Sequence, residues 1–155
     1  MPNFLQVQQK AIKLTPEKVR KDLFKFIRSL ESYLAELNRK QIHEKSQDVN
    51  GNPLGFYSPA TEFITTNNLL LGKGGKIKKA GDPYDLKDTG DFLNNLFVKV
   101  DSDSVFFDTK DPKKQKVLKN LLSDDLFGLS DKELKKVIDK KISPFLLQYY
   151  KNNLL

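Results

Sequence analysis

The stretch from Tyr84 to Val100 constrains the fold of this chain more than any other, because its hydrophobic period changes midway. Asp88 and Thr89 have side-chain oxygens that can accept hydrogen bonds from the first amides of a helix, and Gly90 can turn the backbone without a Cβ clash. The apolar residues that follow keep helical spacing for one or two turns and then alternate with other residues, as in a strand. The stretch therefore predicts a structural turn at Asp88, Thr89 and Gly90 that leads through a short helix into a strand.

Two further patterns flank this unit. Ahead of it, Thr15 and Pro16 are a helix start signal, and apolar residues then recur at steps of three and four, which predicts one amphipathic helix over about 16–45. Behind it, two apolar segments, 96–100 and 105–109, flank a polar turn and predict a hairpin. Because a hairpin alone is only marginally stable, we expect the long helix to pack against it.

The whole chain is predicted to be a single α+β domain, in which the long N-terminal helix packs on a small antiparallel sheet and short C-terminal helices flank the core. Its 155 residues are enough to bury a core without disulfides or metals. The expected parts of domain 1–155 are an arm over 1–14, a helix-plus-sheet core over 15–109 with an extended loop at 48–83, and a helical flank over 110–155.

The composition leaves few groups for catalysis. The chain has no cysteine, which excludes disulfides, thiolate metal sites and cysteine nucleophiles. The sole histidine, His43, has no apparent partner near the end of the predicted helix, so we expect it to face solvent. We therefore predict a protein that is not an enzyme, with no catalytic residues, no metal site and no cofactor. No apolar run approaches the roughly 20 residues of a membrane span.

Aspartates recur at every third position between residues 82 and 91. Clustered carboxylates can bind a metal ion or act as general acids and bases. A proline and the predicted turn interrupt any helix that would place these side chains on one face, so helix capping and solvation are favoured. A small enzyme with an aspartate site at 82–91 stays open as one alternative.

Charge is unevenly distributed: segments 1–47 and 112–155 each have ten basic and five acidic residues, whereas 82–111 has three basic and eight acidic residues. A glycine- and lysine-rich loop spans 72–81 and lacks the GxxxxGK[ST] spacing of a phosphate-binding P-loop. A basic nucleic-acid-binding protein is therefore another alternative, although the aromatic residues of single-strand binders are not interleaved with the lysines. The candidate interaction residues are Lys73, Lys76, Lys78 and Lys79.

Two stretches together carry a resemblance to a known family. One is the turn NGNPL at 50–54, which follows the amphipathic helix and leads to the sequence YSP at 57–59. The other is YDLKDTGDFL at 84–93, which leads into the strand pair. They resemble the virion morphogenesis and tail-completion family of tailed bacteriophages, which includes the Mu-type G protein and related head–tail joining proteins. The resemblance covers residues 15–109, and the basic glycine loop and the C-terminal helices depart from it.

This resemblance implies an α+β structural protein without catalytic residues, located in the virion at the neck or tail after assembly in the host cytoplasm. The protein would be a head–tail connector or tail-completion component that forms a ring through protomer–protomer contacts. Its expected partners are further copies of itself and other virion proteins (portal, connector or tail tube), with non-specific contact to packaged DNA and no membrane. A ring needs an interface that repeats with rotation, and an exposed hairpin edge could accept a neighbour's strand.

Overall fold

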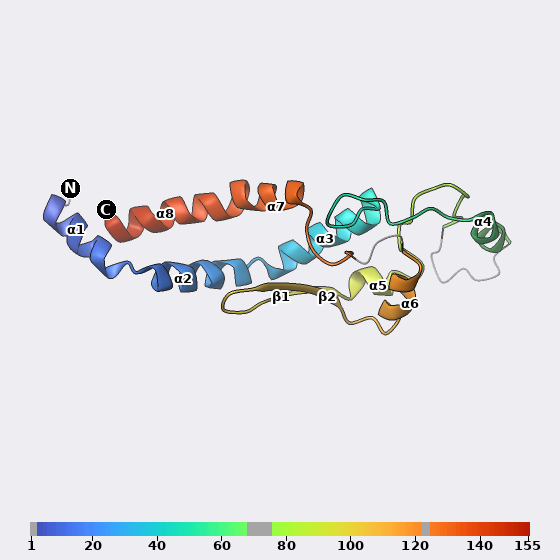
Figure 1. The fold of residues 1–155 in the computed structure, drawn as a ribbon, viewed down its shortest axis with the longest axis horizontal. Coiled ribbons are helices and arrows are strands. Elements are labelled where there is room, and N and C mark those ends of the chain that lie inside the picture. Colours follow the sequence, from blue (N-terminus) through green and yellow to red (C-terminus); the bar gives the residue numbers. More distant parts are fainter. Residues whose placement is uncertain (1–2, 68–75, 122–124) are drawn as a thin grey trace.

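The computed structural model of the protein describes residues 3–67, 76–121 and 125–155. Within these residues the chain forms helices and a two-stranded antiparallel sheet, so the fold is α+β. The molecule is elongated, with both ends of the chain at one tip and helix α4 at the other (Figure 1). The elements in chain order are α1 (Phe4–Lys13), α2 (Pro16–Arg28), α3 (Glu31–Lys45), α4 (Pro59–Thr66), α5 (Asp91–Asn94), β1 (Leu96–Val100), β2 (Val105–Thr109), α6 (Lys114–Lys119), α7 (Asp131–Val137), the π-helix η1 (Ile138–Ile142) and α8 (Ser143–Leu154).

The single helix predicted over 16–45 is wrong, because this segment forms two helices, α2 and α3. The first begins as expected, with the Thr15 hydroxyl accepting a hydrogen bond from an amide of the first turn. It ends at Arg28. The hydroxyl of the next residue, Ser29, donates to the carbonyl oxygen of Phe26 at 2.6 Å, and α3 starts after Leu30. A serine that bonds back to the preceding turn favours a bend. The apolar period continues across the break, so the period alone could not reveal it.

Helix α3 packs on the inner face of the hairpin and forms one half of the core. Leu34 and Ala35 of the helix are buried against Val98 and Val100 of β1. The strands pair antiparallel with Val100 opposite Val105, and alternate residues of β1 are buried, as expected for a sheet with one covered face. The predicted contact between the N-terminal helical region and the hairpin is therefore present, with α3 at its centre.

A second cluster joins the end of α3 to the predicted turn-helix-strand unit. Ile42 and Leu54 have no exposed surface, and Phe92 and Leu93 of α5 pack in the same cluster. Gly90 is the residue that precedes α5, with a φ of +91° that an L-residue with a Cβ adopts only at a cost. The predicted unit is thus part of the core, and glycine occupies the position where the backbone requires it.

Two buried amide side chains connect α3 to the segment that precedes α7. Nδ2 of Asn38 donates to the carbonyl oxygens of Leu126 and Gly128, at 3.3 and 2.7 Å. Oε1 of Gln41 accepts from the backbone N–H of Ser130 at 2.8 Å. Because burying an amide without partners is costly, these bonds allow polar groups to lie inside the core and fix the C-terminal segment on α3.

The C-terminal helices return along the N-terminal ones, as Figure 1 shows for α8 above α2. The ring of Phe145 stacks on Phe26 with centroids 4.1 Å apart, and the Tyr149 hydroxyl donates to a carboxylate oxygen of Asp22 at 2.7 Å. Burial and this hydrogen bond raise the pKa of Tyr149 to about 12. Even so, no side chain is buried in α1, α2 or α8, all of whose residues are described.

Candidate interaction pocket

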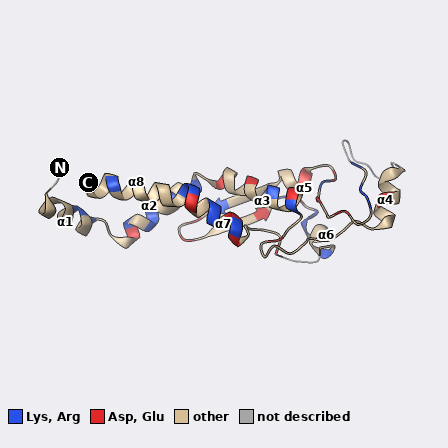
Figure 2. Ribbon diagram, turned by 90° about the horizontal axis from the view of Figure 1, so that it is seen from above, with Lys and Arg blue, Asp and Glu red and all other residues tan. Residues whose placement is uncertain are grey.

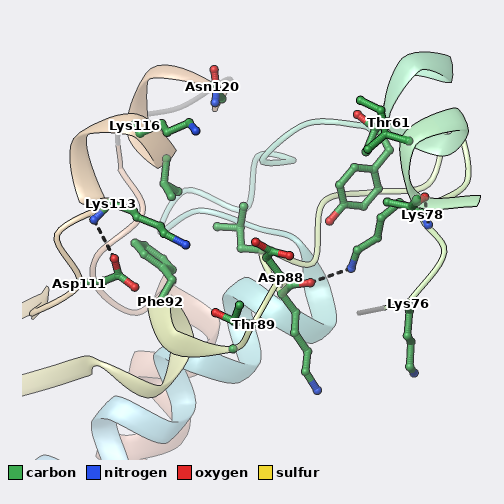
Figure 3. A pocket seen from close by; sticks show the side chains of 17 residues that line it. Thr61, Lys76, Lys78, Asp88, Thr89, Phe92, Asp111, Lys113, Lys116 and Asn120 are labelled. Carbon is green, nitrogen blue, oxygen red and sulfur yellow. Dashed lines mark hydrogen bonds between the residues drawn. The ribbon is translucent and has the colours of Figure 1, made fainter. Parts of the chain in front are cut away.

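A cavity of about 460 Å³ opens between α4, the chain that precedes α5, and α6. Figure 3 shows side chains from these three segments converging on it. Part of the lining is apolar and comes from Ile64, Leu86, Phe92 and Val117. A cavity of this size with a largely apolar lining and a few polar groups has the ordinary features of a binding site.

Lysines dominate the charged part of the lining. They come from the segment that follows the undescribed residues 68–75, from the turn before α5, and from the start of α6. Two aspartates oppose them, so the lining has a surplus of positive charge. Among the described residues, the lysines that line the cavity are Lys76, Lys78, Lys87, Lys113 and Lys116, and the aspartates are Asp88 and Asp111.

One of these lysines, Lys78, stabilises the fold through bonds to its own chain. Its Nζ lies 2.7 and 2.6 Å from the two carboxylate oxygens of Asp85 and 2.9 Å from the carbonyl oxygen of Lys87. Its side chain is only 11% exposed. The hydroxyl of Tyr57 donates to the same carboxylate at 2.6 Å. These bonds fasten the chain around Lys78 to the chain around Tyr57 and form one wall of the cavity.

The protonation of this cluster follows from its contacts. Burial alone would raise the pKa of the Asp85 carboxyl, but hydrogen bonds from Lys78 and Tyr57 outweigh it and hold that pKa below its usual range. Burial and the hydrogen bond to Asp85 raise the pKa of the Tyr57 hydroxyl above its usual range. Neither shift moves a group towards neutral pH, where a general acid or base is most effective.

The other four lysines that line the cavity differ from Lys78. Within the described part of the chain, no carboxylate forms an ion pair with Lys76, Lys87, Lys113 or Lys116. A partner with negative charge would therefore meet ammonium groups that need not first break a bond to their own chain. The site is best suited to an anionic partner that also offers apolar surface.

The aspartates at 82–91 do not converge. Asp85 is bound as described above, and a carboxylate oxygen of Asp91 accepts from the Thr89 hydroxyl at 2.6 Å. Asp88 lines the cavity, while Asp82 accepts a hydrogen bond through its backbone carbonyl. Across residues 3–67, 76–121 and 125–155, no three histidine, cysteine, aspartate or glutamate side chains group in a way that could hold a metal ion.

The three residues of the predicted structural turn occupy different positions. Gly90 directly precedes α5 in the left-handed conformation and is buried. The Thr89 hydroxyl lies 3.4 Å from the N–H of Asp91, close to the first amide of the helix. Asp88 is exposed on the wall of the cavity. The turn therefore connects the core to the pocket.

Of the predicted interaction lysines, the structure places Lys76 and Lys78 at the cavity. Lys79 is exposed and is not part of the lining, and Lys73 lies outside the described residues. The expectation that His43 faces solvent is wrong, because the ring is half-buried with Nδ1 2.9 Å from the carbonyl oxygen of Asp85. That partner is far away in sequence, so no local pattern pointed to it.

Sequence reasoning also missed Lys87, Lys113 and Lys116 as parts of the pocket. The last two are three residues apart at the start of α6, a spacing that places two side chains on one side of a helical turn. That spacing was visible in the sequence. Which segment these two lysines face depends on the packing of α6 near the distant chain before α5, and local patterns do not specify that packing.

The two stretches that carry the family resemblance lie against each other in space. The N–H of Tyr84 donates to the carbonyl oxygen of Gly55 at 2.9 Å, and Phe56 forms an isolated antiparallel bridge with Pro83. The rings of Tyr57 and Tyr84 meet edge to face with centroids 4.9 Å apart. The stretches thus form one local unit, which lies beside the pocket.

Comparisons of the chain with protein-family models, with curated proteins and with solved structures found no match. The suggested phage family therefore remains a prediction, and function has to be argued from the surfaces and the cavity. Among the described helices, none has the length and apolar character needed to cross a membrane.

Proposed function

We propose that this protein is a structural subunit of a tailed-phage virion, a neck or tail-completion component that joins copies of itself and bridges two larger assemblies. The observation that supports this most is exposed apolar surface at both tips of an elongated molecule. Exposed large apolar side chains are candidate contact sites, because leaving them in water is unfavourable. A subunit with such surface at both tips can contact two neighbours at once.

The two tips offer different side chains. At the tip with the chain ends, Phe4, Leu5 and Ile12 project from α1. At the opposite tip, Phe63 lies on α4 and Phe56 lies in the chain that leads to it. All five side chains are between 52% and 81% exposed. Burying one such side chain against a neighbour is worth about 1.5–3 kcal/mol, so a few of them are enough to favour association.

The virion location rests on the family resemblance. Its two stretches form one packed unit beside the pocket, which is compatible with a shared role. The ring follows from the same resemblance, since a closed ring needs a heterologous interface that repeats with rotation. The tips are different surfaces on one molecule, as such an interface requires.

The test is mass spectrometry and electron microscopy of purified particles from cells that carry the gene. We expect the protein in the particles, at the neck or tail. Phe63→Asp should leave the free energy of unfolding unchanged and reduce incorporation, because Phe63 is exposed on α4. Thr66→Asp adds the same charge at another exposed position of that helix and should incorporate normally. Absence of the protein from particles would refute the proposal.

A nucleic-acid-binding protein is the second candidate, favoured by the four cavity lysines that form no ion pair with any described residue. Against it, basic and acidic residues are interspersed along the described part of the ribbon, as Figure 2 shows. Four phosphate contacts would give a slope of about −3.6 in log K against log salt for duplex DNA. A slope near that value for arbitrary DNA, made shallower by about 0.9 in Lys113→Gln, would favour this candidate over the virion proposal.

A further inference from the structure

The sheet has two edges, and its hydrogen bonds tell which backbone groups point out of each. The N–H of Asp101 donates to the carbonyl oxygen of Ser104 at 2.9 Å, and the N–H of Lys110 donates to that of Asn95 at 3.0 Å. Hydrogen-bonded and non-hydrogen-bonded pairs alternate along an antiparallel ladder. The even-numbered residues of β1 and the odd-numbered residues of β2 therefore direct their N–H and C=O groups outward.

The outer edge of β1 is covered at its last residue. Nε of Arg28 donates to the carbonyl oxygen of Val100 at 3.1 Å, and the N–H of Val100 donates to Oε1 of Glu31 at 2.8 Å. These side chains belong to the end of α2 and the start of α3, both of which contact β1. A further strand could not pair along this edge without displacing them.

The outer edge of β2 is open. The N–H of Thr109 is used, because it donates to Oδ1 of Asp108 at 2.7 Å. Within the described residues, no side chain or loop forms a hydrogen bond with the outward N–H and C=O groups of Val105 and Phe107. Val105 and Phe106 are also 37% and 53% exposed. Neither proline nor lysine, the usual protections of an edge, occurs in β2.

The charges on either side of β2 specify which strand would fit this edge. The hairpin turn before it contains Asp101 and Asp103, whereas the segment 110–114 after it contains three lysines, Lys110 among them, and one buried aspartate, Asp111. Antiparallel pairing of two copies of β2 brings the acidic turn of each copy alongside the lysines of the other. Parallel pairing would bring like charges together. Charge complementarity thus favours a second copy of the same strand, in antiparallel orientation.

We propose that β2 of a second copy pairs antiparallel with β2 along this edge, so that two hairpins form one continuous sheet. Val105 of each copy then lies opposite the other copy's Phe107, and each such pair exchanges two N–H···O bonds. This register pairs the outward N–H and C=O groups of Val105 and Phe107. It does not require the N–H of Thr109, which is already bonded to Asp108. It also places the exposed Phe106 rings opposite each other in the closest kind of pair, where aromatic contacts stabilise a sheet.

This inference rests on the proposed function, since it names the surface through which two copies of an assembly subunit meet. The contact is two-fold and closes on itself, so it is a different contact from the heterologous one that repeats around the ring. It therefore predicts a dimer in solution, and the apolar tips stay available for the contacts that build the larger assembly.

The first experiment compares Val105→Pro with Val105→Thr by sedimentation equilibrium of the full chain. Proline removes the outward N–H and is tolerated at the first residue of an edge strand, whereas threonine keeps the N–H and the β-branched shape. Two lost hydrogen bonds of about 1 kcal/mol each predict that Val105→Pro raises the dimer Kd about 30-fold or more. Val105→Thr should stay close to the unmodified chain.

The second experiment tests the antiparallel arrangement through charge. Asp103→Lys and Lys110→Glu each place like charges side by side in the dimer, so each variant alone should associate more weakly than the unmodified chain. An equimolar mixture places lysine against glutamate and the original aspartate against the original lysine. The mixture should therefore associate about as well as the unmodified chain, and added salt should reduce these differences.

Three results would overturn the inference: an unmodified chain that stays monomeric up to its solubility limit, a Val105→Pro chain that is folded and dimerises as tightly as Val105→Thr, or charge variants whose mixture associates no better than each alone. If Val105→Pro does not fold, the charge variants decide. A monomer that is nevertheless found in particles refutes the dimer and leaves the proposed function standing. A dimer that is absent from particles supports the contact between the β2 strands and refutes the proposed function.

Discussion

Helix α1 is fully capped at its start but is not buried, whereas helix α3 has no side-chain cap but is deeply buried. Asn3 and Gln6 form a complete capping box at the start of α1, yet none of the residues Phe4–Lys13 is buried. Leu30 precedes α3 without any side-chain cap, and that helix contains the most deeply buried residues of the N-terminal region. Local signals therefore start helices, whereas tertiary contacts decide which helix holds the fold. The centre of the molecule stabilises the chain, and its tips are available to neighbours.

The most direct test of this contrast is to shorten a leucine side chain in each of the two regions. Leu34→Ala empties space between α3 and the hairpin, where the side chain is 4% exposed, and should cost about 2–5 kcal/mol. Leu5→Ala removes an exposed side chain from α1 and should change the free energy of unfolding by less than about 0.5 kcal/mol. Urea denaturation measures both. Equal costs would show that the tip is part of the core.

Glycines at the base of the α4 tip test where the packed region ends. Gly55 has a φ of +135°, and a Cβ there would lie 2.8 Å from Cδ2 of Tyr84, so Gly55→Ala should cost about 2–4 kcal/mol from strain and overpacking. Gly51 has a φ of +81° with open space around it, so Gly51→Ala should cost only about 1–2 kcal/mol. Thermal unfolding of the two variants checks the order, and a reversed order would place the packed boundary elsewhere.

Polar side chains should show the same contrast. Asn38→Ala removes the donor that binds the carbonyl oxygens of Leu126 and Gly128 inside the core, and should cost about 1–3 kcal/mol. Asn152→Ala removes an exposed amide from α8 and should have almost no effect. Free energies of unfolding from urea titration compare them. If Asn38→Ala were as mild as Asn152→Ala, the buried amide would not be holding the C-terminal segment on α3.

Low pH should destabilise the centre of the molecule, where α7 contacts α3. Hydrogen bonds from Lys136 and Lys45 lower the pKa of Glu133, which connects α7 to α3. A lowered folded pKa means that its contribution is complete above the unfolded value of about 4.3 and is lost as pH falls through the folded value. Glu133→Gln should reduce the loss of stability between about pH 5 and pH 2. Asp139→Asn, at an exposed ion pair, is the control for removing a surface carboxylate and should change the free energy of unfolding at pH 7 by less than about 1 kcal/mol.

Local signals in the sequence were sufficient for the turn at Gly90, the hairpin, and the start of the helix after Thr15. They failed where a distant part of the chain decides the outcome. The break after Ser29 follows an uninterrupted apolar period, and the contact of His43 with Asp85 joins residues on separate elements. The pocket lysines had no common signal, since packing of distant segments brings them together. Local chemistry thus predicted the elements, and long-range packing created the candidate site.

Native-state hydrogen exchange of the full chain tests the central claim most directly, because it measures the stability of each region without a partner. We predict that amides of α3 and β1 exchange only through global unfolding, whereas amides of α1, α4 and the end of α8 exchange at least about 100-fold faster through local opening. Low concentrations of denaturant should speed exchange in α3 and β1 more than exchange at the tips, so that the rates of the two groups converge. Equal protection of the tips and the centre would contradict the account, because the tips would then be stable parts of the fold with no need of neighbours.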